Sequence, residues 1–249
     1  MDRRRRGGAG DGPSAKKARL RESEGARGVR ILRELVCEPH VGDIILGLLG
    51  VGAIPDSMRG HRRTMLAVVR LDGLALEHAS EQLRGDRDGV LAAVRHDGWA
   101  LEWASQQLKG DREVVLIAVR RHGKALRFAS LQLKGDREVV LAAVGQSGCA
   151  LQWASHQLKN DRNVVLVAVK QHGYALCIAS DQLRGDREVV LAAVRQDGYA
   201  LQHASQQLKG DREVVLAAVK QTGGALHYAS QQLRGDREVA SAAAAHWAR

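Results

Sequence analysis

The stretch GDREVVLIAVRRHGKALRFASLQLK, residues 110–134, decides the fold of this 249-residue chain because a near copy of it follows without a gap. The copy, GDREVVLAAVGQSGCALQWASHQLK, covers residues 135–159. The glycine that opens each copy recurs every 25 residues from Gly60 to Gly235, replaced once by Asn160. Seven complete periods and a truncated eighth, which ends ASAAAAHWAR, predict a stacked array whose terminal units differ from the rest.

Each period predicts two short helices. Asp111 is suited to cap the first, since its carboxylate can accept from the free amides of the first turn, and Glu113 stands where the helix dipole favours an anion. An apolar run follows over residues 114–119. Gly123 stands where a glycine with positive φ would end that helix. A second helix is expected over residues 125–134, where apolar residues recur at helical spacing.

The apolar run VVLAAV could instead be a buried strand, and one strand plus one helix in every period would give an α/β horseshoe. Two alanines in the run and the acidic cap before it argue against a strand. We therefore expect an all-α fold, a right-handed-type α-solenoid of about seven and a half 25-residue two-helix repeats with a disordered basic N-terminal leader.

The chain divides into three parts by composition. Residues 1–30 are Gly-rich and hold ten basic and four acidic residues, which predicts a disordered leader. Residues 31–59 contain two apolar stretches and are expected to form a short helical cap for the array. The sequence beginning at Asp43 is similar to the start of an F-box, a helical adaptor for ubiquitin ligases. Residues 60–249 are the repeat array.

Two basic clusters of the leader resemble a bipartite nuclear import signal. They are Arg3, Arg4, Arg5 and Arg6, and Lys16, Lys17 and Arg19. Nonspecific contact with nucleic acid, a solvated tail or an organelle address are the alternatives. Three widely separated cysteines exclude a disulfide framework, and no apolar stretch approaches the 18 residues of a membrane span. We expect an intracellular protein that does not enter membranes, with the nucleus favoured over the cytoplasm.

Seven of the eight aromatic residues occupy two positions of the predicted second helix, four residues apart. They are Trp99, Trp103, Phe128, Trp153, Tyr174, Tyr199 and Tyr228. Stacking would align them as a ribbon in which residues at i and i+4 are neighbours. The ribbon could anchor a partner chain, or its rings could fill gaps between adjacent units. Trp99 with Trp103 is the pair that we expect to contact a partner.

The sequence contains no pattern typical of catalysis. It has no phosphate-binding glycine loop, no nucleophile elbow and no histidine or cysteine pair at metal-binding spacing. The Asp-Arg-Glu triplet recurs in nearly every period, whereas a catalytic site is assembled once. We expect the Asp to cap a helix and the Arg and Glu to pair with neighbouring units. The predictions are no enzyme, no metal and no cofactor.

The recurring pattern DREVVLAAV, a glycine, and ALxxAS resembles the helical repeat family filed as domain of unknown function 4116. One family unit is about two of these periods, and the resemblance covers roughly residues 60–239. It implies tandem α-helical arrays and no activity or cofactor. Departures are Asn160 for Gly, Asn163 for Glu, and Gly145 inside a first helix. Gly145 is expected to weaken its helix by about 1 kcal/mol relative to Ala.

These patterns predict a monomeric, non-enzymatic scaffold that binds a protein or peptide through the aromatic ribbon. The net charge of +10 leaves a nucleic-acid-binding solenoid as an alternative, with a basic residue ending each second helix. An Asp follows two residues after each of these basic residues, which dilutes the field. An adaptor with an F-box-like N-terminus, or recent duplications kept without a specific partner, are further alternatives.

Overall fold

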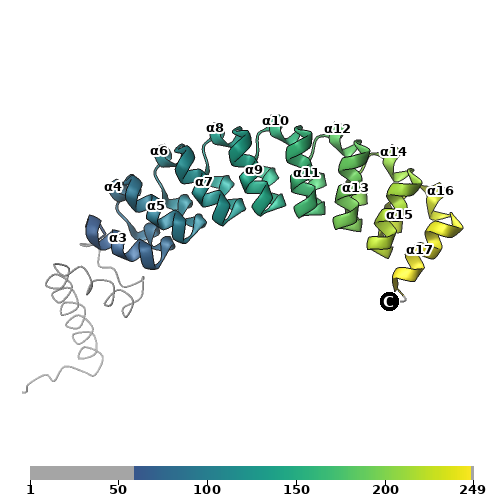
Figure 1. The fold of residues 1–249 in the computed structure, drawn as a ribbon, viewed down its shortest axis with the longest axis horizontal. Helices are drawn as coiled ribbons and strands as arrows, with labels where there is room; N and C mark the ends of the chain where they lie inside the picture. Colours follow the sequence, from purple (N-terminus) through teal and green to yellow (C-terminus); the bar gives the residue numbers. More distant parts are fainter. Residues whose placement is uncertain (1–58, 248–249) are drawn as a thin grey trace, which may run out of the picture.

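The computed structural model describes residues 59–247, which form an elongated arch of helices (Figure 1). Each of seven 25-residue units consists of a ten-residue α-helix, a six-residue 3₁₀ helix and a four-residue α-helix, and an eighth long helix ends the array. No strand occurs in this part of the chain. The α-solenoid is confirmed, and the strand alternative is wrong. The leader and residues 31–58 lie outside the described residues.

The elements recur in a fixed order along the array. The long helices are α3 Arg62–Leu71, α5 Arg87–His96, α7 Arg112–Arg121, α9 Arg137–Gln146, α11 Arg162–Gln171, α13 Arg187–Gln196, α15 Arg212–Gln221 and α17 Arg237–Trp247. The 3₁₀ helices are η3 Gly73–His78, η4 Gly98–Trp103, η5 Gly123–Phe128, η6 Gly148–Trp153, η7 Gly173–Ile178, η8 Gly198–His203 and η9 Gly223–Tyr228. The short helices are α4 Glu81–Arg84, α6 Gln106–Lys109, α8 Leu131–Lys134, α10 His156–Lys159, α12 Asp181–Arg184, α14 Gln206–Lys209 and α16 Gln231–Arg234.

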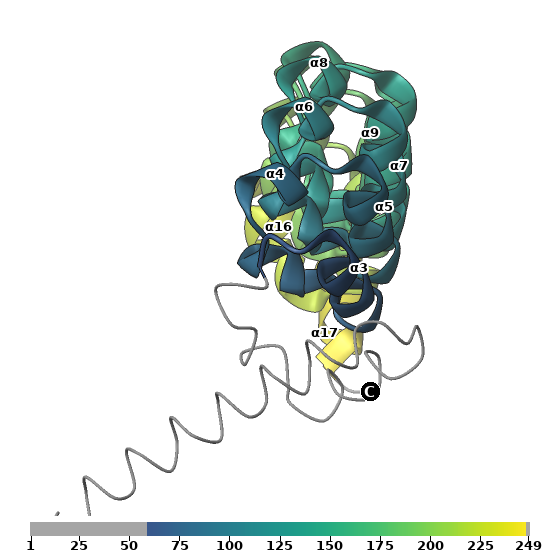
Figure 2. The same cartoon turned by 90° about the vertical axis from the view of Figure 1, so that its left-hand side faces the viewer.

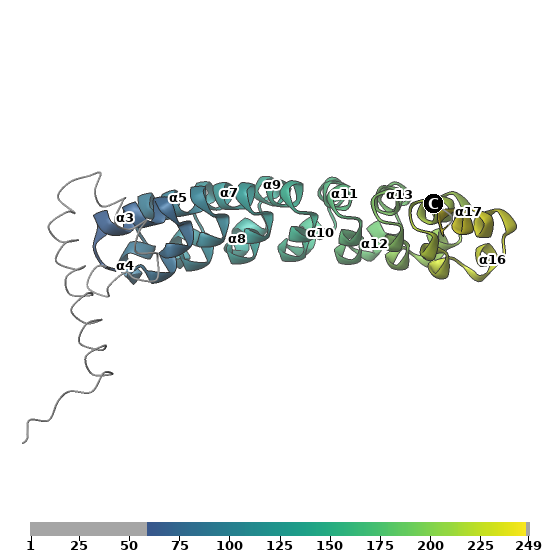
Figure 3. The ribbon, with the colours of Figure 1, turned by 90° about the horizontal axis from the view of Figure 1, so that it is seen from below.

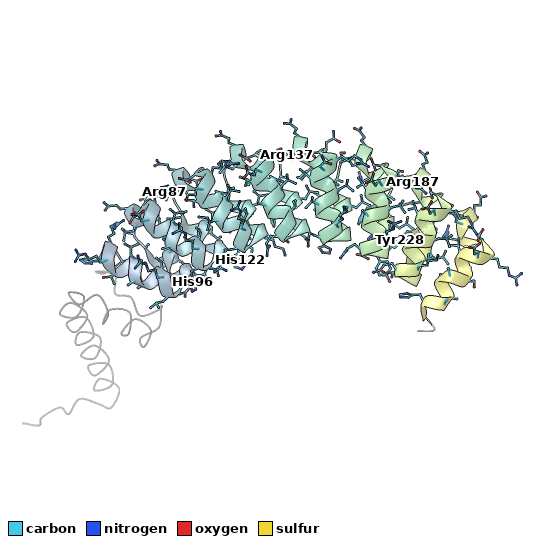
Figure 4. The ribbon with its side chains drawn as sticks, viewed as in Figure 1. Arg87, His96, His122, Arg137, Arg187 and Tyr228 are labelled. Atoms are coloured by element: carbon cyan, nitrogen blue, oxygen red, sulfur yellow. The ribbon has the colours of Figure 1, made fainter. Side chains whose placement is uncertain are left out.

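The units stack into two layers. The long helices form one layer, and the 3₁₀ and short helices form the other (Figures 2 and 3). Consecutive long helices contact each other, and each 3₁₀ helix packs on the long helices of its own and the next unit. The C-terminal ends of the long helices, marked by His96 and His122, lie along the concave edge (Figure 4). The N-terminal ends, marked by Arg87, Arg137 and Arg187, lie along the convex edge.

The long helices begin at the predicted caps. The Asp111 carboxylate accepts hydrogen bonds from the backbone N–H groups of Glu113 and Val114, at 3.0 and 3.1 Å. The same double cap recurs at Asp136, Asp161, Asp186, Asp211 and Asp236. Each cap satisfies two amides that a helix start leaves unpaired. The Asp of the repeated triplet therefore has a structural role in these units.

The core is built from small and branched apolar residues. Val114, Val115, Ala118 and Val119 of α7 are completely buried, as is Leu126 of η5. Their equivalents are buried in the other complete units, except that Leu226 is only partly buried. A ten-residue helix is only marginally stable alone, so burial of this face against neighbouring units stabilises each long helix.

The second half of each unit is split, and the predicted continuous helix over residues 125–134 is wrong. The 3₁₀ helix η5 ends at Phe128, Ala129 has extended backbone (φ −63°, ψ 154°), and α8 begins at Leu131. The break directs the backbone N–H of Ser130 to the carbonyl oxygen of Lys109 in the preceding unit, at 2.9 Å. An inter-unit hydrogen bond thus replaces an intrahelical one. The same bond recurs at Ser80, Ser105, Ser155, Ser180, Ser205 and Ser230.

The recurring glycine after each long helix allows a close approach between units. Gly123 opens η5 without the predicted positive φ, so that prediction is wrong. A Cβ at Gly123 would lie 2.3 Å from the carbonyl oxygen of Ala143 in the next long helix. At Gly98 and Gly148 the corresponding distance is also 2.3 Å. Only glycine lets the two backbones meet at this distance.

Candidate functional site

The seven aromatic residues of the predicted ribbon, here called the aromatic surface, all lie on the 3₁₀ helices. Each is either the second or the last residue of its element. Trp99, Tyr174 and Tyr199 hold the second position. Trp103, Phe128, Trp153 and Tyr228 hold the last. The 25-residue period therefore brings equivalent aromatic positions into consecutive units of one layer.

The rings of the aromatic surface pair between units. Trp99 meets Phe128 edge-on with ring centroids 6.1 Å apart, and Tyr199 meets Tyr228 in the same way at 6.3 Å. The ring of Tyr174 likewise meets His203 edge-on at 5.1 Å. The second position of one unit thus contacts the last position of the next.

The predicted i, i+4 neighbour relation within one unit is wrong because the element is a 3₁₀ helix. With about three residues per turn, residues four apart are rotated by about 120° from each other. Trp99 and Trp103, expected to act as a pair, therefore point in different directions from η4. The ring of Trp99 stacks instead on His122 of the next unit, with centroids 6.0 Å apart.

Burial separates the two aromatic positions. Residues at the last position, among them Trp103, Phe128, Trp153 and Tyr228, are half-buried against the apolar core. The guanidinium carbon of Arg84 lies 5.6 Å from the centroid of the Trp103 ring. The packing interpretation therefore describes these rings well.

At the second position the rings are more accessible. The exposed fractions of Tyr174 and Tyr199 are 47% and 44%, while Trp99 is half-buried. Leu74 at the same position is 41% exposed. The part of the aromatic surface that is open to a partner is thus its row of second positions.

Along the convex edge, the arginine of each triplet joins two units. Arg112 Nε lies 3.0 Å from Asp136 Oδ2, and its Nη2 lies 2.5 Å from Glu138 Oε2. Arg62, Arg87, Arg162, Arg187 and Arg212 make equivalent pairs with the next unit. Arg137 pairs with Asp161 alone, because Asn163 replaces the acidic residue. The predicted pairing between neighbouring units is confirmed, and we call this set the ion ladder.

The ion ladder lowers the pKa of its cap carboxyl groups. The hydrogen bond from Arg162 holds the pKa of Asp186 below its usual value, against the opposing effect of partial burial. At Asp111, partial burial raises the pKa, but the hydrogen bonds from the Val114 amide and from Arg87 together lower it by more, so the pKa lies below its usual value. These carboxylates are therefore engaged with amides and guanidinium groups of the array.

The basic residues that end the short helices were considered for nucleic-acid binding. Lys109 and Lys134 are half-buried, and burial lowers the pKa of both amines. Arg84 donates from Nη2 to the carbonyl oxygen of Glu77 at 2.6 Å, besides covering Trp103. Apart from Arg234, which is exposed, the residues at this position are half-buried, so they do not form an open cationic stripe.

A different set of basic residues is exposed, and the sequence analysis did not single it out as a row. It lies in the last turn of the long helices and is here called the basic row: Arg70, Arg95, Arg120, Lys170, Arg195 and Lys220. Gly145 interrupts it in α9. Within residues 59–247, none of these six side chains joins an ion pair. Comparing the residue seven positions after each triplet Glu would have revealed the row.

Two residues of the basic row border an open groove of about 420 Å³ between α13 and α15. Arg195 and Lys220 line it together with Leu216 and Ala217. Glu213 and Gln221 complete the lining. The groove combines apolar side chains with two cationic groups and the carboxylate of Glu213.

The described residues hold no group of three or more histidine, cysteine or acidic side chains placed to bind a metal ion. In the same range, no helix has the length and apolarity needed to cross a membrane. The residues of the predicted import signal, Arg3–Arg6, Lys16, Lys17 and Arg19, and the F-box-like segment at Asp43 lie outside the described residues.

A comparison with protein families finds one match, to the domain of unknown function family DUF4116, over residues 86–134, 136–184, 186–234 and 211–244. Each of the first three matches spans about two of the 25-residue units. No curated protein and no solved structure matches the chain. The matched segments cover more than half of the chain and coincide with the stacked units, so the protein belongs to the DUF4116 family of tandem helical repeats.

Proposed function

We propose that the array is a non-enzymatic scaffold that binds a protein or peptide through the accessible part of the aromatic surface. The observation that carries this proposal is the pair of exposed rings at Tyr174 and Tyr199, each held edge-on by a ring of the next unit. A ring fixed in this way has lost much of its rotamer freedom before binding. Rigid aromatic side chains on an exposed surface are typical binding anchors.

The proposal that the protein is not an enzyme is supported by the use made of its triplets. The carboxylates and guanidinium groups that could resemble a catalytic set are engaged as caps and ion pairs in unit after unit. Repetition of this kind fits a structural role. The chain is further proposed to act as a monomer. The two basic clusters in residues 1–30 support the proposal that it enters the nucleus.

The experiment that tests the scaffold is a comparison of two variants of the full chain in quantitative cross-linking from a cell extract. Tyr174→Ala/Tyr199→Ala removes the exposed rings, and Leu131→Ala removes an apolar side chain that is 85% exposed on a short helix. We expect the double variant to lose a defined set of captured proteins by about tenfold or more, while Leu131→Ala retains them. If the double variant retains every captured protein, the aromatic surface is not a binding site.

Binding of single-stranded nucleic acid is the second candidate function, and the exposed basic row favours it. Titration of a random oligonucleotide at increasing salt separates it from the scaffold. A steep loss of affinity with salt would support nucleic-acid binding. Absence of binding at low salt would remove it.

A further inference from the structure

The long helices α5, α7, α13 and α15 present three kinds of side chain along their exposed face, whereas α3, α9, α11 and α17 lack either the acidic or the basic one. In α7, Glu113, Ile117 and Arg120 are separated by four and three residues, so they lie on one side of the helix. Stacking of the units turns these positions into three parallel rows. An acidic row follows the convex edge, a partly buried apolar row runs between, and the basic row follows the concave edge.

On each helix the acidic and basic positions are seven residues apart, which is about two turns. Seven residues at about 1.5 Å each put them about 10 Å apart. The acidic side chains are well exposed, with 70% of Glu188 and 66% of Glu213 accessible. Charge on this face is therefore organised in bands: the glutamates at the convex edge are paired with arginines of the ion ladder, and the narrow cationic band at the concave edge has no such partners among the described residues.

The basic row also has a fixed period along the array. Packed helices lie about 8–10 Å apart, and the ends of helices on the concave side of an arch are nearer the lower value. A polyproline II helix repeats every three residues, about 9.3 Å. Side chains at every third residue of such a segment therefore lie on one face, and their repeat exceeds the spacing of the basic row by about 1 Å. The long Arg and Lys side chains can span this difference over a few units.

We infer that the basic row binds an extended acidic segment of a partner protein, in the polyproline II conformation, whose carboxylates recur at every third residue. This inference rests on the proposed function and names the chemistry of the partner. One carboxylate faces each basic side chain, and the apolar row supports the segment from below. The groove bordered by Arg195 and Lys220, with Leu216 and Ala217 at its floor, is one such step of the binding site.

The aromatic surface supports the same partner. Tyr174 and Tyr199 follow Lys170 and Arg195 by four residues, at the same end of their units. Proline-rich extended segments dock on grooves lined by aromatic rings. A segment with acidic residues on one face and prolines on the others would therefore meet charges and rings in every unit that has both.

The banded charge argues against a nucleic acid on this face. A nucleic-acid strand is wider than an extended peptide, and its phosphates would come within about one Debye length of the exposed acidic row. Asp97 and Asp197 stand two residues after members of the basic row. Their carboxylates accept hydrogen bonds from the backbone N–H groups of Trp99 and Tyr199. A narrow anion thus fits the cationic band better than a broad one.

The test is fluorescence anisotropy with the full chain and a labelled peptide of seven Glu-Pro-Pro repeats. A peptide of the same composition with its glutamates clustered at one end is the comparison, and a single-stranded oligonucleotide of equal charge is the third probe. Because the basic residues 1–30 are present in every variant, differences between variants report on the basic row. We expect the periodic peptide to bind several-fold more tightly than the clustered one.

Removal of charge has a matched control. Arg195→Gln/Lys220→Gln should weaken binding of the periodic peptide about tenfold, at about threefold for each exposed pair. Arg234→Gln/Arg237→Gln makes the same change at exposed basic residues of α16 and α17, away from the row, and should leave binding unchanged. A last-turn basic residue also stabilises its helix through the dipole, so all variants are compared at temperatures where circular dichroism shows them fully folded.

Addition of charge gives a test that misfolding cannot imitate. A Cβ at Gly145 would have no neighbour within 4 Å, so Gly145→Lys fills the gap in the basic row. Gly145→Ala strengthens the same helix without adding charge. We expect Gly145→Lys to bind the periodic peptide about threefold more tightly than Gly145→Ala does.

Four results would overturn the inference: equal binding of the two peptides, an equal loss in the control variant, tighter binding of the oligonucleotide that falls in the Arg195→Gln/Lys220→Gln variant, or no peptide binding. Failure here is distinguishable from failure of the scaffold, because Tyr174→Ala/Tyr199→Ala is judged by captured cellular proteins. Loss of those proteins without recognition of the periodic peptide would reject the acidic segment alone.

Discussion

Two glycines of one unit, Gly145 and Gly148, are predicted to respond to alanine with opposite signs. Gly148 begins η6, and a Cβ there would lie 2.3 Å from the carbonyl oxygen of Ala168 and 3.0 Å from the Cβ of His172. Gly145 lies in the last turn of α9, and a Cβ there would meet nothing within 4 Å. The same chemical change, three residues apart, therefore tests the close approach between units.

The magnitudes follow from these distances. A contact of 2.3 Å has to open by about 1 Å before a methyl group fits against an oxygen, and this separates α11 from η6 in a densely packed array. Overpacking of this kind costs about 1–3 kcal/mol. Alanine at Gly145 instead removes the helix penalty of glycine and adds about 1 kcal/mol. At about 2–4 °C per kcal/mol, we expect Gly148→Ala to lower Tm by roughly 2–12 °C and Gly145→Ala to raise it by roughly 2–4 °C.

Thermal unfolding followed by circular dichroism measures both shifts, and hydrogen exchange locates them. Protection in Gly148→Ala should fall first in η6 and α11, because stacked units depend on their nearest neighbours. A Tm for Gly148→Ala equal to that of the unmodified chain would refute the role assigned to the recurring glycine. A fall in Tm for Gly145→Ala would show that the position is not open.

Three further predictions concern the ion ladder. Asp186→Ala removes a double cap and should lower the free energy of unfolding by about 1 kcal/mol, which would lower Tm by about 2–4 °C. Glu188→Gln changes a side chain that is 70% exposed and should change Tm by less than about 1 °C. The folded-state pKa values of five cap carboxyl groups lie below normal, at Asp111, Asp136, Asp161, Asp186 and Asp211. Their contribution to stability is therefore present above the unfolded pKa of about 3.9 and is lost as pH falls through the folded values. The urea concentration at the unfolding midpoint, measured from pH 6 to pH 3, should decrease once the pH is below about 4, and an unchanged midpoint at pH 3 would contradict this. Asn163→Glu gives Arg137 a second acidic partner, and it should raise Tm by about 1–3 °C in low salt and by nothing measurable in 1 M NaCl.

The long helix and its cap could be predicted from the sequence because both depend on local chemistry. Asp111 and the apolar residues after it need only their own helix to reveal their roles, and the structure shows both where they were expected. The constancy of the triplet also predicted pairing between units correctly, since a charge that recurs in register meets its counterpart in every neighbour.

The second half of the unit could not be predicted in the same way. The spacing of apolar residues over 125–134 fits a continuous helix, and what breaks it is a hydrogen bond from Ser130 to a carbonyl 21 residues earlier. Gly123 likewise carries no mark that distinguishes a left-handed turn from a close approach to Ala143. Both features belong to contacts between units. The pairing of Trp99 with Phe128 was missed for the same reason, because a helical wheel describes one unit only.

The recurrence of the basic row needs a cause of its own. The triplet Asp and Arg, the glycine and the serine recur because each makes a defined contact within its own unit or with a neighbouring one, as at Arg112, Gly123 and Ser130. The basic row recurs in six units without an ion pair to any described residue.

The helix dipole favours a basic residue in the last turn, but it does not distinguish between neighbouring positions of that turn. The position directly after the basic row holds Leu71, His96, Arg121, Gln146, Gln171, Gln196 and Gln221. At His96, Gln146 and Gln196 this side chain accepts a hydrogen bond from a glycine N–H of the preceding unit. This contact between units favours a hydrogen-bond acceptor at the second position, which leaves the basic-row position for the charge that the dipole favours. The fixed position therefore has a cause within the array, and Gly145→Lys is the most informative single change because it tests directly whether the completed row also binds an external anion.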